Sequence, residues 1–349
     1  MSELSGSVAW RSPSNIALIK YWGKRPVQIT QNASISFTLT NSHTDTRVKY
    51  EQLDSGDGPE VVFFFEGKKE TSFATRIIKY LQSIKGHLPF LNHVKLTIES
   101  SNSFPHSSGI ASSASSMSAL ALCLCEIEQR IEGIEGKSES LWKKASFLAR
   151  LGSGSACRSV FPGMAAWGTT NHIAGSTNDR AIQVKGCDPI FYEFHDDVLI
   201  VSEEKKSVSS SAGHALMDTN PFAQVRYQQA DQNMEMLLAA MKEGNLELFG
   251  QIVEDEALTL HALMMCSNPS YLLMKPGTLT AINQIREFRA SSGVPVYFTL
   301  DAGPNVHILY PNHAKNEVQT FLENIVLAQS SQLRVISDRV GPGPINLLS

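Results

Sequence analysis

Small and hydroxyl-bearing residues crowd one stretch of the chain, Phe104 to Ser116, which reads FPHSSGIASSASS. Residues 94–98 before it alternate like a strand, and the apolar residues between 117 and 127 recur at the spacing of a helix face. A loop there presents the unpaired N–H groups and positive end of a helix, which hold phosphate oxygens. Gly109 permits close backbone approach, and the hydroxyls of Ser112 and Ser113 can reach a phosphate or its Mg²⁺. Phosphate binding is therefore favoured over the alternative, a serine-rich linker.

A second chemically active segment, SPSNIALIKYWGKR, begins at residue 12. We predict a strand over residues 15–21, in which Lys20 shares a face with apolar neighbours, so its ammonium group needs a partner. Lys24 and Arg25 follow across Gly23 and form a compact cationic group beside two aromatic residues. Such a group suits a small substrate that carries phosphate or carboxylate. The alternative is a strand whose polar end simply reaches water.

Two later segments add a possible anion site and a carboxylate. GSGSACRS, residues 152–159, combines backbone donors, hydroxyl groups and the guanidinium of Arg158, which favours anion binding over an ordinary loop. TLDAGPN, residues 299–305, places Asp301 in a turn directly after a predicted strand. Turn aspartates are common, but beside a phosphate site such a carboxylate can orient or deprotonate an accepting hydroxyl.

The composition argues against several classes of protein. The 349 residues carry a formal net charge of −4 without a basic run, so we expect neither a nucleic-acid nor a membrane partner. The five cysteines show no CxxC spacing and the first residues do not resemble a signal peptide, so we expect reduced thiols in a cytoplasmic protein. The histidines lack metal-ligand spacing, and His261, on a helical pattern, is expected to be a packed or interface residue. GKS at residues 136–138 fails as a Walker A loop because Ile131 stands where that motif has glycine.

The pattern of elements predicts an α+β fold in two domains. Strands are expected over residues 15–21, 35–39, 46–50, 61–65 and 94–98, and helices over 73–84, 117–127 and 141–150. Further along, helices over 221–241, 246–265 and 278–291 interleave with strands over 198–202, 296–300 and 306–310. Helices around a mainly antiparallel sheet favour α+β over a doubly wound fold. We place the domains at residues 1–188 and 189–349, and expect the C-terminus to pack back on the first domain.

In this order, the segments resemble the GHMP kinase superfamily and, within it, the diphosphomevalonate decarboxylases. The resemblance is carried by SPSNIALIKYWGKR, FPHSSGIASSASS, RLGSGSACRSVFPGMAAW and TLDAGPN. VSSSAGHALMDTNPF, LHALMMCSNP and the terminal RVGPGP give weaker support, and the likeness spans almost the whole chain. The phosphate loop marks only the superfamily, whereas YWGK with GSGSACRS is typical of the decarboxylase branch.

The resemblance implies a two-domain GHMP-kinase fold, with a ribosomal-S5-like N-terminal ATP-binding domain and a ferredoxin-like C-terminal domain. It also implies a homodimeric enzyme that uses ATP and Mg²⁺ to phosphorylate the 3-hydroxyl of mevalonate 5-diphosphate. Loss of phosphate and CO₂ would then give isopentenyl diphosphate. The same chemistry on mevalonate 5-phosphate, a GHMP kinase that stops after phosphorylation, and a catalytically silent binding protein stay open as alternatives.

Matching the family motifs position by position implies roles for individual residues. The catalytic residues would be Asp301, which engages the 3-hydroxyl, Lys20 and Arg158. The substrate-binding residues would be Tyr21, Trp22, Gly23, Lys24, Arg76, Ser153, Gly154, Ser155, Ala156, Cys157 and Ser211. The nucleotide-binding residues would be Asn102, Pro105, His106, Ser107, Ser108, Gly109, Ile110, Ala111, Ser112 and Ser113, with Ser112 also near Mg²⁺.

The chain departs from the family in two places. After YWGKR it reads PVQITQNAS, without the acidic pair of many family members. Ser211 stands where some bacterial members have arginine and others a hydroxyl residue. Both departures bear on how the substrate's terminal phosphate is held.

Overall fold

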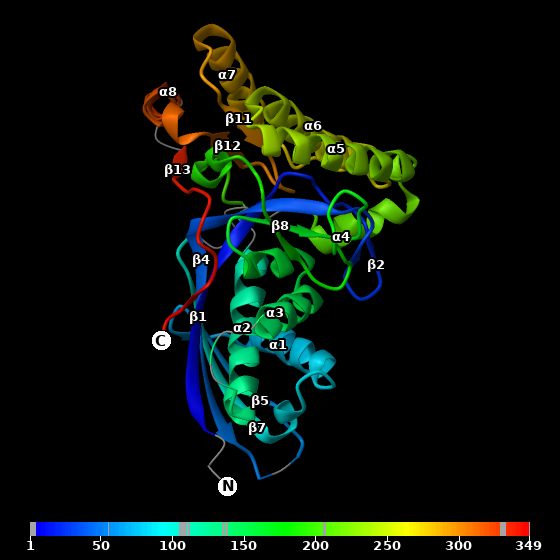
Figure 1. Ribbon diagram of the computed structural model, residues 1–349, viewed down its shortest axis with the longest axis vertical. Coiled ribbons are helices and arrows are strands. Elements are labelled where there is room, and N and C mark those ends of the chain that lie inside the picture. The colour runs from blue at the N-terminus through cyan, green and yellow to red at the C-terminus, as the bar shows by residue number, and fades with distance from the viewer. Residues whose placement is uncertain are drawn as a thin grey trace.

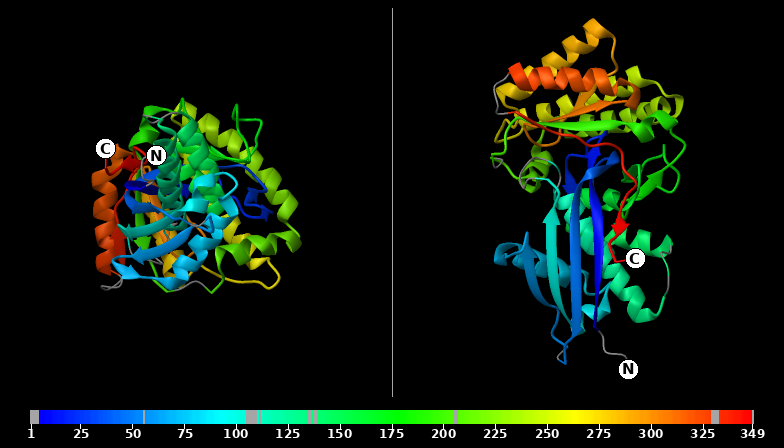
Figure 2. Two further views of the ribbon diagram at one scale, coloured as in Figure 1. Left: turned by 90° about the horizontal axis from the view of Figure 1, so that it is seen from below. Right: turned by 90° about the vertical axis from the view of Figure 1, so that its left-hand side faces the viewer.

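The computed structural model describes residues 5–54, 56–104, 110, 112–134, 136, 139–204, 207–328 and 333–348. The molecule is elongated, with one sheet and its helices at the end that holds the N-terminus, and a second sheet with further helices at the other end (Figure 1). Figure 2 shows the long strands of the first sheet running along the molecule towards the second sheet, which lies across their far ends.

The larger sheet is built around two long strands, β1 (Gly6–Ala17) and β4 (Ser34–Gln52). Its order is β14-β1-β4-β7-β5-β6, while β8 pairs with β4 and β9 with β8. Among the described pairs of this sheet β5–β7 is parallel and the others are antiparallel. The remaining strands are β5 (Glu60–Phe65), β6 (Lys68–Lys69), β7 (Val94–Asn102), β8 (Met164–Trp167), β9 (Ile182–Val184) and β14 (Ile345–Asn346).

Helices α1 (Thr71–Ile84), α2 (Ser112–Glu132) and α3 (Glu139–Gly152) lie beside this sheet (Figure 1). Residues of β7 alternate between buried and more exposed, because one face of the strand meets the helices. Leu96 and Ile98 of β7 share an apolar core with Leu120 and Leu124 of α2. This packing fixes the position of α2 against the sheet.

The smaller sheet is antiparallel, with the order β11-β12-β10-β13. Its strands are β10 (His195–Ile200), β11 (Tyr297–Thr299), β12 (Val306–Tyr310) and β13 (Arg334–Ile336). The helices of this part are α4 (Ser210–Ala215), α5 (Ala223–Glu243), α6 (Leu246–Met265), α7 (Pro276–Ser292) and α8 (Lys315–Ala328). A small hairpin, β2 (Lys24–Arg25) with β3 (Ile29–Thr30), follows β1. Short 3₁₀ helices are η1 (Pro89–His93), η2 (Gly154–Val160), η3 (Pro189–Glu193), η4 (Leu216–Thr219) and η5 (Asn312–Ala314).

The two parts share an apolar core. Ile16 of β1 and Phe37 of β4 pack in one cluster with Met234 of α5 and Phe249 of α6. The C-terminal strand β14 returns to the first sheet and pairs with β1. The boundary predicted at residue 188 stays a prediction, and it falls between β9 of the larger sheet and β10 of the smaller one. Among the described helices, none combines the length and apolar composition needed to cross a bilayer.

The α+β class is confirmed, but the bounds of several predicted elements are wrong. β1 ends at Ala17, because the N–H groups of Leu18 and Ile19 both point to the carbonyl of Ile35, so Lys20 lies beyond the strand. The strands predicted over 35–39 and 46–50 are one strand, β4, since the polar residues between them find buried partners. The segment GSGSACRS forms the end of α3 and the η2 helix rather than an open loop.

Candidate active site

A cavity of about 450 Å³ lies where the chain after β1, the first turn of α2, η2, the start of α4 and the turn after β11 meet. Among the described residues that line it are four cationic side chains and a single carboxylate: Lys20, Lys24, Arg76, Arg158 and Asp301. This excess of positive charge suits a ligand with several negative charges. The five residues come from distant parts of the sequence, and the fold brings them together.

Lys20 and Asp301 form an ion pair, with 3.0 Å between Nζ and Oδ1. The Lys20 side chain is 3% exposed and that of Asp301 28%, so the ammonium group is enclosed while the carboxylate still faces the cavity. Asp301 is thus the partner that the apolar surroundings of Lys20 require. His261 of α6 is buried, as expected for a packed residue, and its Nε2–H donates to the backbone carbonyl of Asp301 over 3.1 Å.

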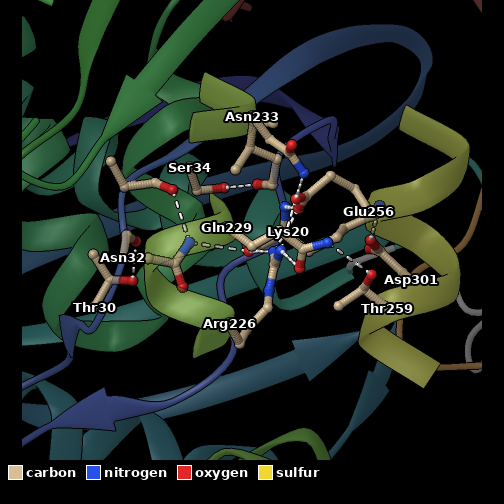
Figure 3. A network of polar contacts seen from close by, with 12 residues as sticks. Lys20, Thr30, Asn32, Ser34, Arg226, Gln229, Asn233, Glu256, Thr259 and Asp301 are labelled. Atoms are coloured by element: carbon tan, nitrogen blue, oxygen red, sulfur yellow. Dashed lines mark hydrogen bonds and ion pairs between the residues drawn. The ribbon is translucent and has the colours of Figure 1, made fainter. Parts of the chain in front are cut away.

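The main chain of Lys20 is held by a buried polar network (Figure 3). Its N–H donates to Glu256 of α6 over 2.7 Å, and its carbonyl accepts from Arg226 of α5 over 2.8 Å. Asn32 also donates to this carbonyl. Arg226 and Glu256 pair with each other, and Asn233 donates to the same carboxylate. Residues of α5 and α6 therefore fix a segment that lies outside regular structure.

Arg158 of η2 is almost completely buried and lines the cavity. Its Nε donates to Ser36 and one terminal nitrogen to Asn15. The other terminal nitrogen is buried and has no hydrogen-bond partner among the described residues. No described carboxylate forms a salt bridge with Arg158. The guanidinium also lies over the Tyr21 ring, 5.5 Å from its centroid, and contributes positive charge to the cavity that Arg158 lines.

An aromatic wall encloses one side of the cavity. The ring of His214 stacks on Tyr21 and lies 4.4 Å from the Trp22 ring, centroid to centroid. The rings of Tyr21 and Trp167 form a T-shaped pair. Nδ1 of His214 accepts the N–H of Gly23 over 3.0 Å, so the neutral ring carries its proton on Nε2. Burial, and then the nearby charge of Lys24, lower the pKa of His214 well below its usual value. The wall is therefore uncharged near neutral pH.

The β2–β3 hairpin supplies Lys24, whose Nζ donates to Gln28 over 2.8 Å. Val27 and Gln28 at its tip have φ values of 61° and 58°, a conformation that costs free energy for a β-branched residue. A guanidinium N–H of Arg150 bonds to the carbonyl of Val27 and holds the tip. Arg76, from α1, is exposed and faces the same cavity.

Ser112 and Ser113 in the first turn of α2 line the cavity, and so does Ile110, which precedes the helix. Ser113 and Ser153 lie 3.3 Å apart, oxygen to oxygen, so the start of α2 meets η2 there. Pro105, His106, Ser107, Ser108, Gly109 and Ala111 lie outside the described residues. The predicted loop is therefore described only at Phe104, at Ile110 and from Ser112 onward.

Comparison with known proteins identifies the family of the chain. Residues 12–178 match the family model of the diphosphomevalonate decarboxylase-like N-terminal domain, and residues 198–344 match that of the mevalonate 5-diphosphate decarboxylase C-terminal domain. The chain belongs to the diphosphomevalonate decarboxylase family. This assignment agrees with the resemblance drawn from the motifs alone.

Individual relatives of the family match along nearly the whole chain. The diphosphomevalonate decarboxylase of Schizosaccharomyces pombe is 28% identical, over 96% of this chain and 86% of its own length. The crystal structure of mevalonate diphosphate decarboxylase from Staphylococcus aureus is 28% identical, with a TM-score of 0.84 and 98% of each chain covered. A structure described as MDDEF in complex with MVAPP, AMPPCP and magnesium is 29% identical, with a TM-score of 0.83 and the same coverage.

Most residues that the family motifs imply for the site do line the cavity: Lys20, Tyr21, Trp22, Lys24, Arg76, Ile110, Ser112, Ser113, Ser153, Ser155, Arg158, Ser211 and Asp301. Asn102 instead accepts a hydrogen bond from Thr44 at the end of β7. Gly154, Ala156 and Cys157 are buried and do not line the cavity, and a side chain on Gly154 would meet the Trp167 ring. Gly23 is required by its φ of 103° and by the hydroxyl of Tyr227, 2.4 Å from an added Cβ.

Sequence reasoning missed several residues of this diphosphomevalonate decarboxylase family site. Asn15, Gln28, Ser209, Ser210, His214 and Leu260 also line the cavity. Asn15 and His214 lie inside segments that carry the family resemblance. Their position in those segments could therefore have identified them as candidate site residues. Arg226 and Glu256 gave no signal, because charged residues on a helix usually face water.

Proposed function

We propose that this protein is an ATP-dependent decarboxylase that converts mevalonate 5-diphosphate to isopentenyl diphosphate, ADP, phosphate and CO₂. The observation that carries the proposal is the Lys20–Asp301 pair at the wall of a cavity rich in cations. The names of relatives that match nearly the whole chain support the same reaction.

The cavity residues fit a highly charged substrate. Arg158 lines the cavity, so its positive charge attracts a phosphate or carboxylate group of the mevalonate compound. Lys24 and Arg76 add positive charge, and Ser153, Ser155 and Ser211 add hydroxyl donors. We assign these residues, with Tyr21 and Trp22, to substrate binding.

The start of α2 fits the nucleotide. Backbone N–H groups in the first turn of a helix, together with the hydroxyls of Ser112 and Ser113, are suited to ATP phosphates. We assign Ser112 to Mg²⁺ beside the phosphate oxygens, because its hydroxyl-bearing side chain lines the cavity at the start of α2. When bound, Mg²⁺ neutralises charge on those oxygens.

The reaction assigns separate tasks to Asp301 and Lys20. Asp301 accepts the proton of the 3-hydroxyl as that oxygen bonds to the γ-phosphorus and the bond from this phosphorus to the β-phosphate oxygen breaks. Lys20 orients the carboxylate and stabilises charge on the transferred group. The C3–O bond then breaks as phosphate leaves, and the electrons of the C1–C2 bond form the C2–C3 double bond as CO₂ leaves.

The test supplies each phosphorylated mevalonate with MgATP and measures ADP, CO₂ and product. The expected result is equal amounts of ADP, CO₂ and isopentenyl diphosphate from the diphosphate, at a higher kcat/KM than from the monophosphate. ADP without CO₂ would identify a kinase. A preference for the monophosphate would identify the other decarboxylase, and no ATP turnover would identify a binding protein.

We also propose a cytoplasmic homodimer. All five cysteines are free, which suits a reducing compartment. Phe222, Val225 and Met236, at the start of α5 and along it, are exposed apolar side chains that a second copy can cover. Light scattering coupled to size-exclusion chromatography should give twice the monomer mass, and a monomer would refute the assembly.

A further inference from the structure

We propose that the buried pair of Arg226 and Glu256 is a positioning device for Lys20, and that α6 sets the geometry of the whole Lys20–Asp301 pair. This inference rests on the proposed function, because it assigns an effect on the chemical step. It concerns residues that lie behind the cavity, since neither Arg226 nor Glu256 lines it.

The main chain of Lys20 is held by residues outside its own segment. β1 ends at Ala17, so the N–H and carbonyl of Lys20 find no partner in a strand ladder. Both groups are buried and must be hydrogen-bonded. Glu256 accepts from the N–H, and Arg226 donates to the carbonyl, so one ion pair holds both sides of the residue (Figure 3).

The ion pair is itself fixed. The side chains of Arg226 and Glu256 are 1% and 0% exposed. The carboxylate accepts from two nitrogens of Arg226, from Asn233 and from Lys20. A buried ion pair generally adds little stability compared with apolar residues of the same volume. The specific consequence of this pair is therefore the position of the lysine.

The same helix fixes the other member of the catalytic pair. His261 follows Glu256 by five positions in α6, roughly 7.5 Å along the helix axis. Glu256 holds the main chain of Lys20, and His261 holds the backbone carbonyl of Asp301. One rigid helix thus sets the distance between two residues that lie far apart in the sequence. A shift of about 1 Å at such a pair costs on the order of a hundredfold in rate.

The first test compares two carboxylates of one helix. Glu256→Gln should lower kcat by about ten- to a hundredfold while the KM for each substrate changes less than about threefold. Glu254 is the matched control, because it is buried on α6 and pairs with Arg289, yet does not line the cavity. Glu254→Gln should keep kcat within about twofold of wild type. An equal loss in both variants would refute positioning, because a general effect of losing a buried ion pair would explain it.

The second test asks whether Glu256 acts through Lys20. If it does, Glu256→Gln should reduce kcat no further in a Lys20→Met background. Independent losses that multiply would overturn the proposal. The paired variant Arg226→Met with Glu256→Leu removes both charges, so it avoids a lone buried charge. It should fold, by near-UV circular dichroism and thermal unfolding, and show the same loss of kcat.

The remaining outcomes are also decisive. A folded paired variant with wild-type kcat would refute positioning. Failure of both Glu256→Gln and the paired variant to fold would refute it too, because the pair would then be needed for folding itself. The wild-type protein is assayed alongside, and absence of CO₂ release from wild type would reject the proposed function instead.

Discussion

Replacing Asp301 by Asn tests the proposed chemistry most directly. Asn keeps the shape of the side chain and can still accept a hydrogen bond from Lys20, 3.0 Å away. It loses the negative charge and the capacity to take the proton of the 3-hydroxyl. Loss of a positioned proton acceptor costs about 10²- to 10⁴-fold in kcat, equivalent to about 3 to 5 kcal/mol in the activation free energy.

The effect on folding should be small by comparison. Lys20 is enclosed but keeps one hydrogen bond, and Asp301 is 28% exposed, so the free energy of unfolding should fall by about 1 to 3 kcal/mol. A typical domain remains folded after such a loss.

The assay combines three measurements on Asp301→Asn: release of CO₂ from mevalonate 5-diphosphate, ATP affinity by calorimetry, and thermal unfolding. Asp255→Asn, an exposed carboxylate on α6, is the control and should resemble wild type. The expected result is a folded variant that binds ATP and has lost most of its turnover. A kcat within about threefold of wild type would refute the role of Asp301.

Three further predictions concern the cavity and the cysteines. Lys24→Ala should raise the KM for the diphosphate substrate about tenfold with little change in kcat, and an unchanged KM would contradict its assignment. Since folding lowers the pKa of His214, the unfolded chain binds a proton below about pH 6.5 that the folded chain excludes, so stability falls as the pH drops. In His214→Phe, the free energy of unfolding from urea titrations should therefore fall less between about pH 7 and about pH 5.5, and an equal fall would refute this. Iodoacetamide should label the exposed Cys266 first and the partly buried Cys187 more slowly. Burial raises the thiol pKa values of the three remaining cysteines, which should react only after unfolding: Cys123, Cys125 and Cys157. Mass spectrometry of the labelled peptides identifies the order.

The sequence was informative wherever a local pattern has a local cause. The change from alternating to helical spacing around the small-residue loop predicted β7 and α2, because each spacing belongs to one backbone geometry. The motifs around Lys20, Arg158 and Asp301 were sufficient to indicate the family, and the family models agree. The buried His261 was also expected from its helical pattern.

The sequence was misleading where a segment is stabilised by a residue that lies far away in the chain. The polar residues between the two strands predicted near residues 35–50 indicated a turn, yet β4 continues through them. Asp338, nearly 300 positions away, accepts the backbone N–H groups of Thr40, Asn41 and Ser42 there. No pattern within β4 contains that information.

The sequence by itself determined the α+β class, and its motifs indicated the charged residues Lys20, Lys24, Arg158 and Asp301 that line the cavity. Only the tertiary structure decided that Lys20 pairs with Asp301, and that Arg226 and Glu256 hold its main chain. The physical reason is that helix and strand periodicity reports the burial of neighbours along the chain. The partner of a buried charge is set instead by how whole helices and sheets pack against each other.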